Sequence, residues 1–194
     1  SMTTLKNKVA IVTGSSKGIG AQIALTLAAA GAKTVINYAN DDAAANNIVS
    51  QIKSSGGEAI AVQADVSNAE QVEAMFDATI SAFGKPDILV NSAGIMINKP
   101  IAETTDEDFD RIFAINVKGT FNTLREAATK LNDGGRVVNL SSTTTRMLLP
   151  SYGTYCATKG AVDQLTRIFA KEVGARNITV NAVSPGPTDT ELFH

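Results

Sequence analysis

The segment Thr13–Gly20, with the sequence TGSSKGIG, constrains the fold of this chain more than any other. It follows a short apolar run, residues 9–12, and leads into an alanine- and leucine-rich stretch, so its glycines lie where a buried strand turns into a helix. Gly14, Gly18 and Gly20 have no Cβ atom, which allows a sharp turn and a close approach of the backbone to a ligand. The first N–H groups of the helix remain free to bind a phosphate. The spacing G-x-x-x-G-x-G differs from the commoner G-x-G-x-x-G fingerprint, and three glycines alone do not establish a dinucleotide site.

Apolar segments alternate with helical patterns along the whole chain, which predicts an α/β fold with a doubly wound parallel sheet. The predicted strands are residues 9–12, 33–38, 58–63, 87–91, 136–141 and 178–183. Helices are predicted from the glycine turn to about residue 31, from residue 41 to the glycine pair 56–57, from a Ser67-x-x-Glu70 capping box to residue 83, from about 106 to 131, and from 152 to about 175. No repeat or low-complexity segment interrupts the pattern, so we expect one domain over residues 1–194.

The composition fits one globular domain and narrows the classes of partner. The chain has 194 residues, 44% of them hydrophobic and 19% charged, which is ordinary for a fold with a real core. A net charge of −2 offers no basic face, so we expect no nucleic-acid partner. No apolar segment near the N-terminus is long enough for a signal peptide or a membrane span, so we expect a cytoplasmic protein without a membrane partner. Ser1 before Met2 is interpreted as the remnant of an expression tag.

The chain has one cysteine, Cys156, and one histidine, His194. An intrachain disulfide is therefore impossible, and neither a Cys/His metal cluster nor a histidine-based nucleophile relay can form. We expect no metal site, and we expect any catalytic chemistry to depend on other side chains.

The carboxyl ends of the predicted strands carry residues that suit a ligand site. Ligands of such sheets gather outside these strand ends. The residues there are small, polar or glycine: Thr13-Gly14, Asn37-Tyr38, Asp65-Val66, Asn91-Ser92-Ala93-Gly94, Ser141-Ser142 and Ser184-Pro185-Gly186. Any one of these segments is ordinary for a loop, but all six at one edge favour a binding site.

Tyr155 and Lys159 form a candidate catalytic pair. They are four residues apart on the helix after the fifth strand, so they share one face with Cβ atoms about 5–6 Å apart. A tyrosine with a pKa of about 10 transfers protons poorly at neutral pH unless its phenolate is stabilised. A lysine ammonium about 4 Å away would supply on the order of 4 kcal/mol at an effective dielectric constant of about 20. The structural alternative is an exposed tyrosine beside a solvated lysine, which would be favoured if no other motif were present.

The other motifs are present. They are Thr13-Gly14-x-x-x-Gly18-x-Gly20, Asn91-x-Ala93-Gly94, Asn116, Ser142 thirteen residues before Tyr155, Tyr155-x-x-x-Lys159, and Pro185-Gly186. In order and spacing they resemble the short-chain dehydrogenase/reductase family, over essentially the whole chain. The resemblance implies a Rossmann-like fold, a nicotinamide cofactor, and hydride transfer between the nicotinamide and a carbonyl or alcohol carbon.

The resemblance also implies roles for single catalytic residues. Tyr155 would be the general acid in reduction and the general base in oxidation, and Lys159 would lower its pKa and hold the nicotinamide ribose hydroxyls. Ser142 would hydrogen-bond the substrate carbonyl oxygen. Asn116 would hold open the long helix around a water that links Lys159 to solvent; the structural alternative is a capped kink. Cys156, next to Tyr155, is interpreted as filler and not as a nucleophile.

Cofactor contacts follow from the same resemblance. The glycine turn would face the pyrophosphate, the segment after the third strand would face the adenine, and the segment after the sixth strand would face the nicotinamide amide. Asn91 would lie at the end of the central strand. The residues are Gly14, Ser16, Lys17, Gly18, Ile19 and Gly20; Asn37; Asp65 and Val66; Asn91, Ala93 and Gly94; Tyr155 and Lys159; and Pro185, Gly186 and Thr188. Ser92 departs from the family, which often repeats asparagine at that position.

The choice between NADP and NAD depends on the end of the second strand. An NAD enzyme usually has a carboxylate there to accept from the ribose 2′-OH, and that carboxylate repels a 2′-phosphate. Here the strand ends in Asn37 and Tyr38, and Lys17 lies within the glycine turn, which predicts NADP(H). The rival interpretation places Asp41 or Asp42 on the ribose of NAD(H), although a helix N-terminus explains both carboxylates.

The residues expected around the substrate are largely apolar: Ile95, Met96, Met147, Leu148, Leu149, Leu192 and Phe193. They suggest a carbonyl on a largely apolar body, such as a 3-oxoacyl thioester or a general ketone. The alternative is an NADP(H)-binding regulator or scaffold without turnover. A methyltransferase on the same fold is disfavoured because it would not require Tyr155, Lys159 and Ser142.

Two expectations concern the assembly and the end of the chain. Apolar residues spread around about two-thirds of the circumference of the long helix, more than the sheet can cover. This helix and the one with Tyr155 are therefore predicted to pack against a second subunit, in a homodimer or homotetramer. The family normally continues beyond residue 194 through a substrate-covering helical segment and another strand. We therefore expect either part of a longer polypeptide, which we favour, or a truncated protein without its lid.

Overall fold

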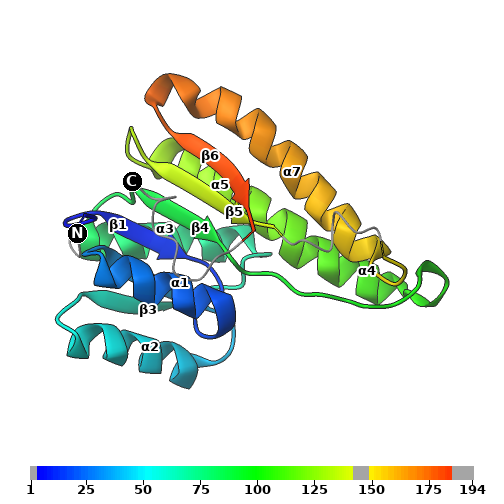
Figure 1. Cartoon of the computed structure of the whole chain (residues 1–194), viewed down its shortest axis with the longest axis horizontal. Coiled ribbons are helices and arrows are strands. Elements are labelled where there is room, and N and C mark those ends of the chain that lie inside the picture. Colours follow the sequence, from blue (N-terminus) through cyan, green and yellow to red (C-terminus); the bar gives the residue numbers. More distant parts are fainter. Residues whose placement is uncertain (1–3, 142–148, 185–194) are drawn as a thin grey trace.

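The computed structural model describes residues 4–141 and 149–184, which form one six-stranded parallel sheet in the order β3-β2-β1-β4-β5-β6 (Figure 1). The strands are β1 (Val9–Val12), β2 (Lys33–Tyr38), β3 (Ala59–Gln63), β4 (Ile88–Asn91), β5 (Arg136–Leu140) and β6 (Thr179–Val183). The predicted doubly wound parallel sheet is confirmed. The strand order reverses between β1 and β4, and this is the point at which such sheets bind ligands.

Helices cover both faces of the sheet. On one face lie α1 (Gly18–Ala29) and α2 (Asp42–Ser54); on the other lie α3 (Ala69–Phe83), the run α4 (Asp106–Phe113), η2 (Ala114–Lys118) and α5 (Gly119–Lys130), and α7 (Gly153–Val173). Two short 3₁₀ helices are η1 (Ile101–Glu103) and η3 (Gly174–Arg176). Within the described residues, no helix combines the length and the apolar character that crossing a bilayer requires.

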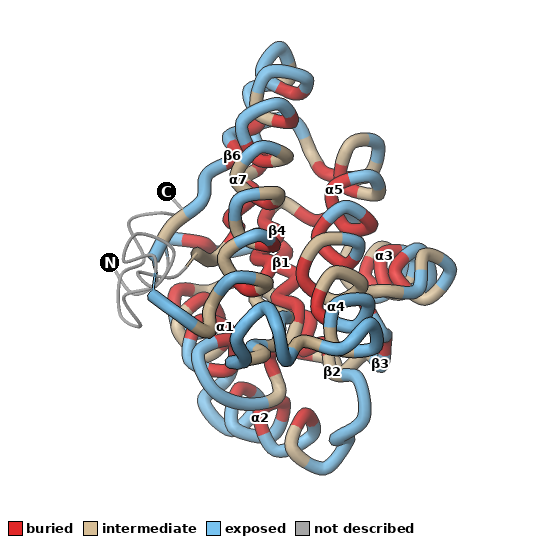
Figure 2. The backbone as a smooth tube through the Cα atoms, turned by 90° about the vertical axis from the view of Figure 1, so that its right-hand side faces the viewer, coloured by how far each residue is buried: buried red, intermediate tan, exposed pale blue. Residues whose placement is uncertain are grey.

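Alternation along the strands gives the sheet two hydrophobic cores. All four residues of β1 are buried, with Ala10 and Val12 in the core under α1 and α2 and Ile11 in the core under α3, α5 and α7. Burying each large aliphatic side chain contributes about 1.5–3 kcal/mol. Figure 2 shows this burial running through the strands and the inner sides of the helices. The strands are therefore fixed in register, and their carboxyl ends form a rigid edge.

The predicted N-cap of α3 is wrong by one residue. The cap is Asn68, whose side chain accepts from the backbone N–H of Gln71 at 3.1 Å. Ser67 lies one residue before the cap, and its hydroxyl donates to Asp65 Oδ1 at 2.7 Å. The side-chain carbonyl of Asn68 therefore accepts from a backbone N–H group that the first turn of the helix leaves without a partner.

The long helix predicted over residues 106–131 is present, and it is opened in its middle, as the resemblance implied for Asn116. Helix α4 passes into the π-helical turn η2 before α5 continues, and α5 ends at Lys130. Such a wide turn inside a helix frequently marks a functional position. Asn116 lies in the middle of it.

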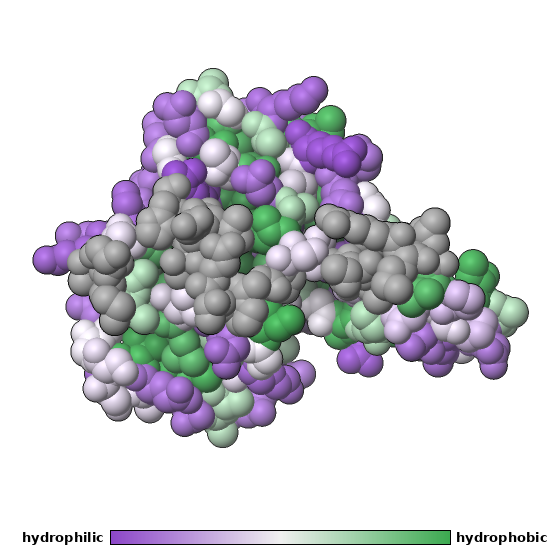
Figure 3. Space-filling model, in the orientation of Figure 1, coloured by the Kyte–Doolittle hydropathy of each residue, from purple (hydrophilic) through white to green (hydrophobic). Residues whose placement is uncertain are grey.

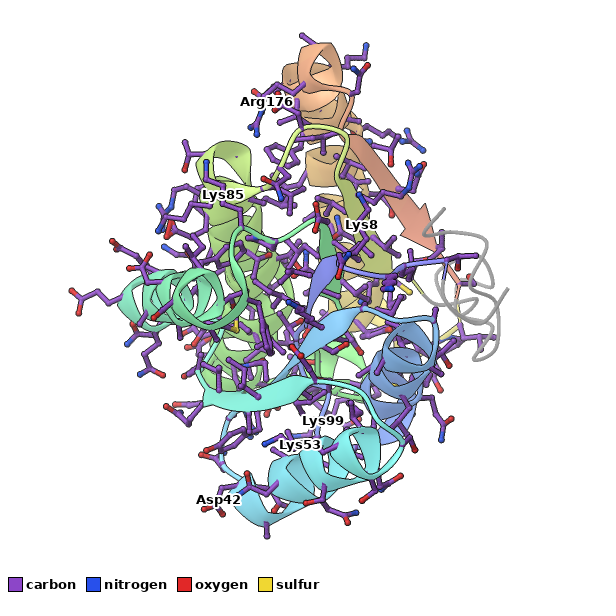
Figure 4. The ribbon with its side chains drawn as sticks, turned by 90° about the vertical axis from the view of Figure 1, so that its left-hand side faces the viewer. Lys8, Asp42, Lys53, Lys85, Lys99 and Arg176 are labelled. Atoms are coloured by element: carbon purple, nitrogen blue, oxygen red, sulfur yellow. The ribbon has the colours of Figure 1, made fainter. Side chains whose placement is uncertain are left out.

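The edge at which the strands begin is closed by Arg176. Its guanidinium donates to the carbonyl oxygens of Ala128 and Leu131, at the end of α5, and to Asp133. These contacts satisfy carbonyl groups that the helix end leaves open. Figure 4 looks onto this edge, with Lys8, Lys85 and Arg176 around it. The candidate site lies at the opposite edge.

Candidate active site

The glycine turn requires two of its glycines for its own packing. A Cβ atom on Gly20 would lie 2.3 Å from the carbonyl oxygen of Gly14, and a Cβ atom on Gly14 would lie 2.8 Å from Ala93 Cα. Gly14 and Gly18 also have positive φ angles, +58° and +62°. Around Gly18, in contrast, nothing lies within 4 Å of an added Cβ atom. Gly14 and Gly20 therefore join α1 to the ends of β1 and β4, while Gly18 borders open space.

Asn37 supports the turn from the end of β2. Its side chain is 2% exposed; Oδ1 accepts from the Gly14 N–H at 3.0 Å, and Nδ2 donates to the carbonyl oxygens of Val62 and Ala64, both at 3.2 Å. The carboxamide is thus used by the protein itself. Sequence reasoning assigned Asn37 to the cofactor, whereas the structure shows a residue that shapes the glycine turn; contact with a cofactor stays a prediction.

A cavity of about 480 Å³ lies over the glycine turn, between the ends of β1, β2 and β4. Its lining includes these predicted residues: Gly14, Ser16, Lys17, Ile19, Gly20, Asn37, Asp65, Val66, Ala93 and Gly94. Gly18 and Asn91 do not line it. Arg111 and Ile115 do, and sequence reasoning missed them. The signal was available, because Ile115 precedes Asn116 and Arg111 lies one helical turn before it.

A second cavity, of about 400 Å³, contains the candidate catalytic pair. Tyr155 and Lys159 line it together with Met96, Leu140, Ser141 and Ser184. Ile19, Ser92, Gly94 and Ile95 line both this cavity and the one over the glycine turn. The two cavities are therefore neighbours along the carboxyl edge of the sheet, on either side of the loop that follows β4.

The predicted pairing of Tyr155 with Lys159 is present in the geometry. Lys159 Nζ lies 5.5 Å from the centroid of the Tyr155 ring and donates to the carbonyl oxygen of Leu140 at 3.3 Å. Tyr155 is 8% exposed, so it is not the solvated tyrosine of the structural alternative. Burial lowers the pKa of the Lys159 ammonium, and the charge of Asp163 acts in the opposite direction. The structure thus holds a largely desolvated amine beside a buried phenol.

Asn116 connects the loop after β4 to α7. Its Oδ1 accepts from the Ile95 N–H and its Nδ2 donates to the Ile95 carbonyl, both at 2.8 Å. Nδ2 also lies 3.3 Å from the hydroxyl of Thr158, which donates to the Tyr155 carbonyl at 2.7 Å. The helix is opened at Asn116, as expected from the resemblance, and the opened turn presents the amide to Ile95. The water link from Lys159 to solvent stays a prediction.

Several predicted residues lie outside the described residues. They are Ser142, Met147, Leu148, Pro185, Gly186, Thr188, Leu192 and Phe193. Of the residues predicted around the substrate, Ile95 and Met96 line the cavity with Tyr155, and Leu149 is exposed. Figure 3 shows hydrophobic surface at the right-hand end of the molecule, where the loop that leads into α4 lies.

Comparison with known proteins is consistent with this geometry. A family model described as short chain dehydrogenase matches residues 8–194. AacuN, a short chain dehydrogenase/reductase of Aspergillus aculeatus, is 46% identical over 191 residues, which cover 98% of this chain and 72% of that protein. A probable tetrahydroxynaphthalene reductase of Zymoseptoria tritici is 44% identical, with the same shares covered. The crystal structure of a putative dehydrogenase from Burkholderia cenocepacia with bound NADP has a TM-score of 0.90 and 38% identity, and the match covers 100% of this chain and 74% of that one.

Proposed function

The chain belongs to the short-chain dehydrogenase/reductase family, and on this premise we propose that it is an NADP(H)-dependent oxidoreductase acting on a carbonyl or alcohol carbon. The substrate is small and largely apolar, and Tyr155 is the general acid and base. One observation carries the proposal: Tyr155 and Lys159 face a cavity that adjoins the cavity over the glycine turn. A dinucleotide bound along the carboxyl edge of the sheet would place its phosphates in the cavity over the glycine turn and its reactive ring in the cavity with Tyr155.

The residues present fit a dinucleotide. Among the described residues, no side chain caps the N-terminus of α1, which begins after Lys17. Its first N–H groups therefore have no side-chain cap, and Ile19 and Gly20 of its first turn line the cavity, so the partial positive charge of the helix end suits a pyrophosphate there. The open space at Gly18 allows a phosphate to approach the backbone. We propose that residues 1–194 form one nucleotide-binding domain.

In the proposed reaction, the nicotinamide supplies or accepts the hydride. The Tyr155 hydroxyl gives a proton to the substrate oxygen in reduction and removes it in oxidation. The Lys159 ammonium favours the phenolate form electrostatically and hydrogen-bonds the ribose hydroxyls. Ser142 hydrogen-bonds the substrate oxygen, and Asn116 fixes the backbone of Ile95 beside the reacting carbon. Pro185, Gly186 and Thr188, which lie outside the described residues, would hold the nicotinamide amide.

We propose NADP(H) because neither Asn37 nor Tyr38 at the end of β2 carries a carboxylate; Asp41, three residues later, lines the cavity. Asn37 is used by the glycine turn, and Asp41 caps α2 by accepting from the Ala44 N–H at 3.0 Å, which explains its position without a ligand. Lys17 is exposed on the wall of the nucleotide cavity. A crystal structure at 38% identity was solved with NADP bound. These observations support a 2′-phosphate near Lys17.

Lys17→Gln is expected to weaken NADPH binding about 10-fold and to leave NADH binding within about twofold, because only NADPH has the 2′-phosphate that a lysine can pair with. Fluorescence titration of both cofactors measures this. Lys53→Gln, on the exposed end of α2, is the matched control and should change neither. Equal weakening of both cofactors by Lys17→Gln, or a clear NADH preference of the unaltered protein, would refute the assignment.

The substrate class follows from the wall of the catalytic cavity. Ile95 and Met96 make it apolar beside Tyr155, which suits a ketone, a 3-oxoacyl thioester or an aromatic carbonyl. A relative named as a probable tetrahydroxynaphthalene reductase supports the aromatic choice. A panel of such carbonyls, assayed by loss of NADPH absorbance, tests the function. NADPH binding without turnover of any of them would favour a regulator or scaffold.

We also propose a homo-oligomer, because α4 and α5 expose aromatic side chains. Phe109 is 47% exposed and Phe121 is 39% exposed. Phe121 borders a shallow hollow together with Phe113, Val117 and Leu165 of α7. A second copy would cover this surface. Light scattering at micromolar concentration is expected to give at least twice the mass of the 20.2 kDa chain. A monomer would contradict the proposal.

A single cysteine fits a reducing compartment, and we propose the cytoplasm.

A further inference from the structure

A row of buried polar side chains crosses the sheet below the catalytic cavity. Asn91 and Asn139 are direct neighbours in the register of β4 and β5, and Asn91 Nδ2 donates to Asn139 Oδ1 at 2.7 Å. On one side, the hydroxyl of Thr123 in α5 lies 2.7 Å from Asn91 Oδ1. On the other, Asn139 Nδ2 donates to the hydroxyl of Thr166 in α7 at 2.7 Å. We call these four residues the amide row.

From Asn91 to α7 the hydrogen bonds of the amide row run in one direction: Asn91 donates to Asn139, and Asn139 donates to Thr166, whose own proton goes to the Val162 carbonyl at 2.7 Å. The single proton of the Thr123 hydroxyl has two acceptors within reach, Asn91 Oδ1 at 2.7 Å and the Thr120 carbonyl at 2.8 Å. All four side chains are at least nine-tenths buried. A buried network of this kind strengthens when it is complete and is costly when one member loses its partner. It therefore holds α5, β4, β5 and α7 in one relative position.

The row ends on the face of α7 that carries the catalytic pair. Tyr155, Lys159, Val162 and Thr166 follow one another at helical spacings of four, three and four residues, so they lie on one side of the helix. This side of α7 makes two hydrogen bonds with β5. Lys159 Nζ donates to the Leu140 carbonyl, and the Thr166 hydroxyl accepts from the side chain of Asn139, the residue before Leu140. Nothing in sequence reasoning assigned a role to Asn139 or Thr166.

We propose that Asn139 and Thr166 are positioning residues, which fix where α7 lies along β5 and thereby set the distance between Tyr155, Lys159 and the bound nicotinamide. The inference rests on the proposed function. A hydrophobic contact tolerates sliding of a helix, whereas a hydrogen bond between two buried groups does not. A shift of about 1 Å at the reacting groups can cost on the order of 100-fold in rate.

The chain offers a matched control for Thr166. Thr79 of α3 is also a buried helical threonine, and its hydroxyl donates to the carbonyl four residues earlier, Met75, at 2.8 Å. Thr166 does the same toward Val162, and differs by also accepting from Asn139. Replacing either threonine by valine keeps the shape and removes the hydroxyl. Only Thr166→Val breaks the amide row.

The experiment compares Thr166→Val, Thr166→Ser and Thr79→Val with the unaltered protein. Thr166→Val is expected to lower kcat about 10-fold with NADPH affinity within about twofold, and Thr166→Ser, which keeps the hydroxyl, to restore kcat. Thr79→Val should leave both quantities within about twofold. Asn139→Ala removes the donor to Thr166 from the β5 side, changes no residue of α7 and should also lower kcat, which covers the case that Thr166→Val does not fold.

A second readout does not need turnover. It is the pH at which Tyr155 ionises, measured from the phenolate absorbance of each variant. The same variant with Tyr155→Phe added serves as the reference. This pH should shift in Thr166→Val and stay unchanged in Thr166→Ser and Thr79→Val. Equal behaviour of Thr166→Val and Thr79→Val in this titration would overturn the inference. If the unaltered protein reduces no carbonyl, the proposed function fails, and the titration still decides whether the row positions the pair.

Discussion

Tyr155→Phe is expected to lower kcat about 1000-fold while NADPH affinity stays within about twofold, because the change removes one oxygen atom from the proton donor and nothing else. The ring remains, so the packing of this 8% exposed side chain is kept. Lys159 Nζ keeps its contact with the Leu140 carbonyl. The loss therefore reports on proton transfer and not on the shape of the cavity. Steady-state kinetics and a fluorescence titration of NADPH measure the two quantities.

Tyr152→Phe is the matched control for this experiment. Tyr152 is the N-cap residue of α7, three positions before Tyr155, and its side chain makes no cap hydrogen bond. The same deletion of a phenolic oxygen there should leave kcat within about twofold. Activity of Tyr155→Phe close to that of Tyr152→Phe would remove Tyr155 from the reaction.

Gly20→Ala is expected to weaken NADPH binding at least about 100-fold and to lower thermal stability, because the added methyl group would lie 2.3 Å from the Gly14 carbonyl oxygen and 2.9 Å from Ser92 Oγ. Neither neighbour can move freely: one is backbone of the glycine turn, and the other follows β4. The turn itself must therefore change shape, and with it the N–H groups proposed to bind the pyrophosphate.

Gly84→Ala serves as the control for Gly20→Ala. Gly84 caps α3, has φ of +96°, and an added Cβ atom would meet nothing within 4 Å. With ψ of −177° as well, this conformation is essentially restricted to glycine, so alanine there costs about 1–3 kcal/mol of backbone strain, or several degrees in Tm for a chain of this size, without touching the proposed site. Isothermal titration with NADPH and thermal unfolding separate the two effects. Wild-type NADPH affinity in Gly20→Ala would contradict the assignment of the turn.

The fold was predictable because its signals are local. Strand and helix periodicities, and the glycines that end the segments, specify the order of elements, and the structure confirms six parallel strands with helices on both faces. The cap of α3 was missed by one residue because Ser67 and Asn68 are both good N-cap residues, and the local pattern does not distinguish them; in the structure Asn68 is the cap and Ser67 bonds Asp65. Competition of this kind is not visible in the spacing of residues.

Many of the residues that line the two cavities were predicted from the sequence, whereas their hydrogen-bond partners were not. The spacing of Tyr155 and Lys159 indicated a shared face, and their geometry agrees. Asn37 was predicted to contact the cofactor because it lies near the end of β2. Its hydrogen-bond partners in the protein are the glycine turn and the segment after β3, which come close only in the folded chain. The π-helical turn at Asn116 arises similarly, since its amide bonds the backbone of Ile95 across 21 residues of sequence. Long-range partners of polar side chains decided each of these cases.

The most direct test of the proposed mechanism follows a labelled hydride. The protein is supplied with NADPH that carries deuterium at the transferable C4 position, together with a carbonyl substrate from the panel, and the product is analysed by mass spectrometry and NMR. We predict one deuterium on the carbinol carbon of the product, with the rate of its formation reduced about 1000-fold in Tyr155→Phe. Alcohol product without deuterium at that carbon, or deuterium transfer by Tyr155→Phe at the wild-type rate, would contradict the account.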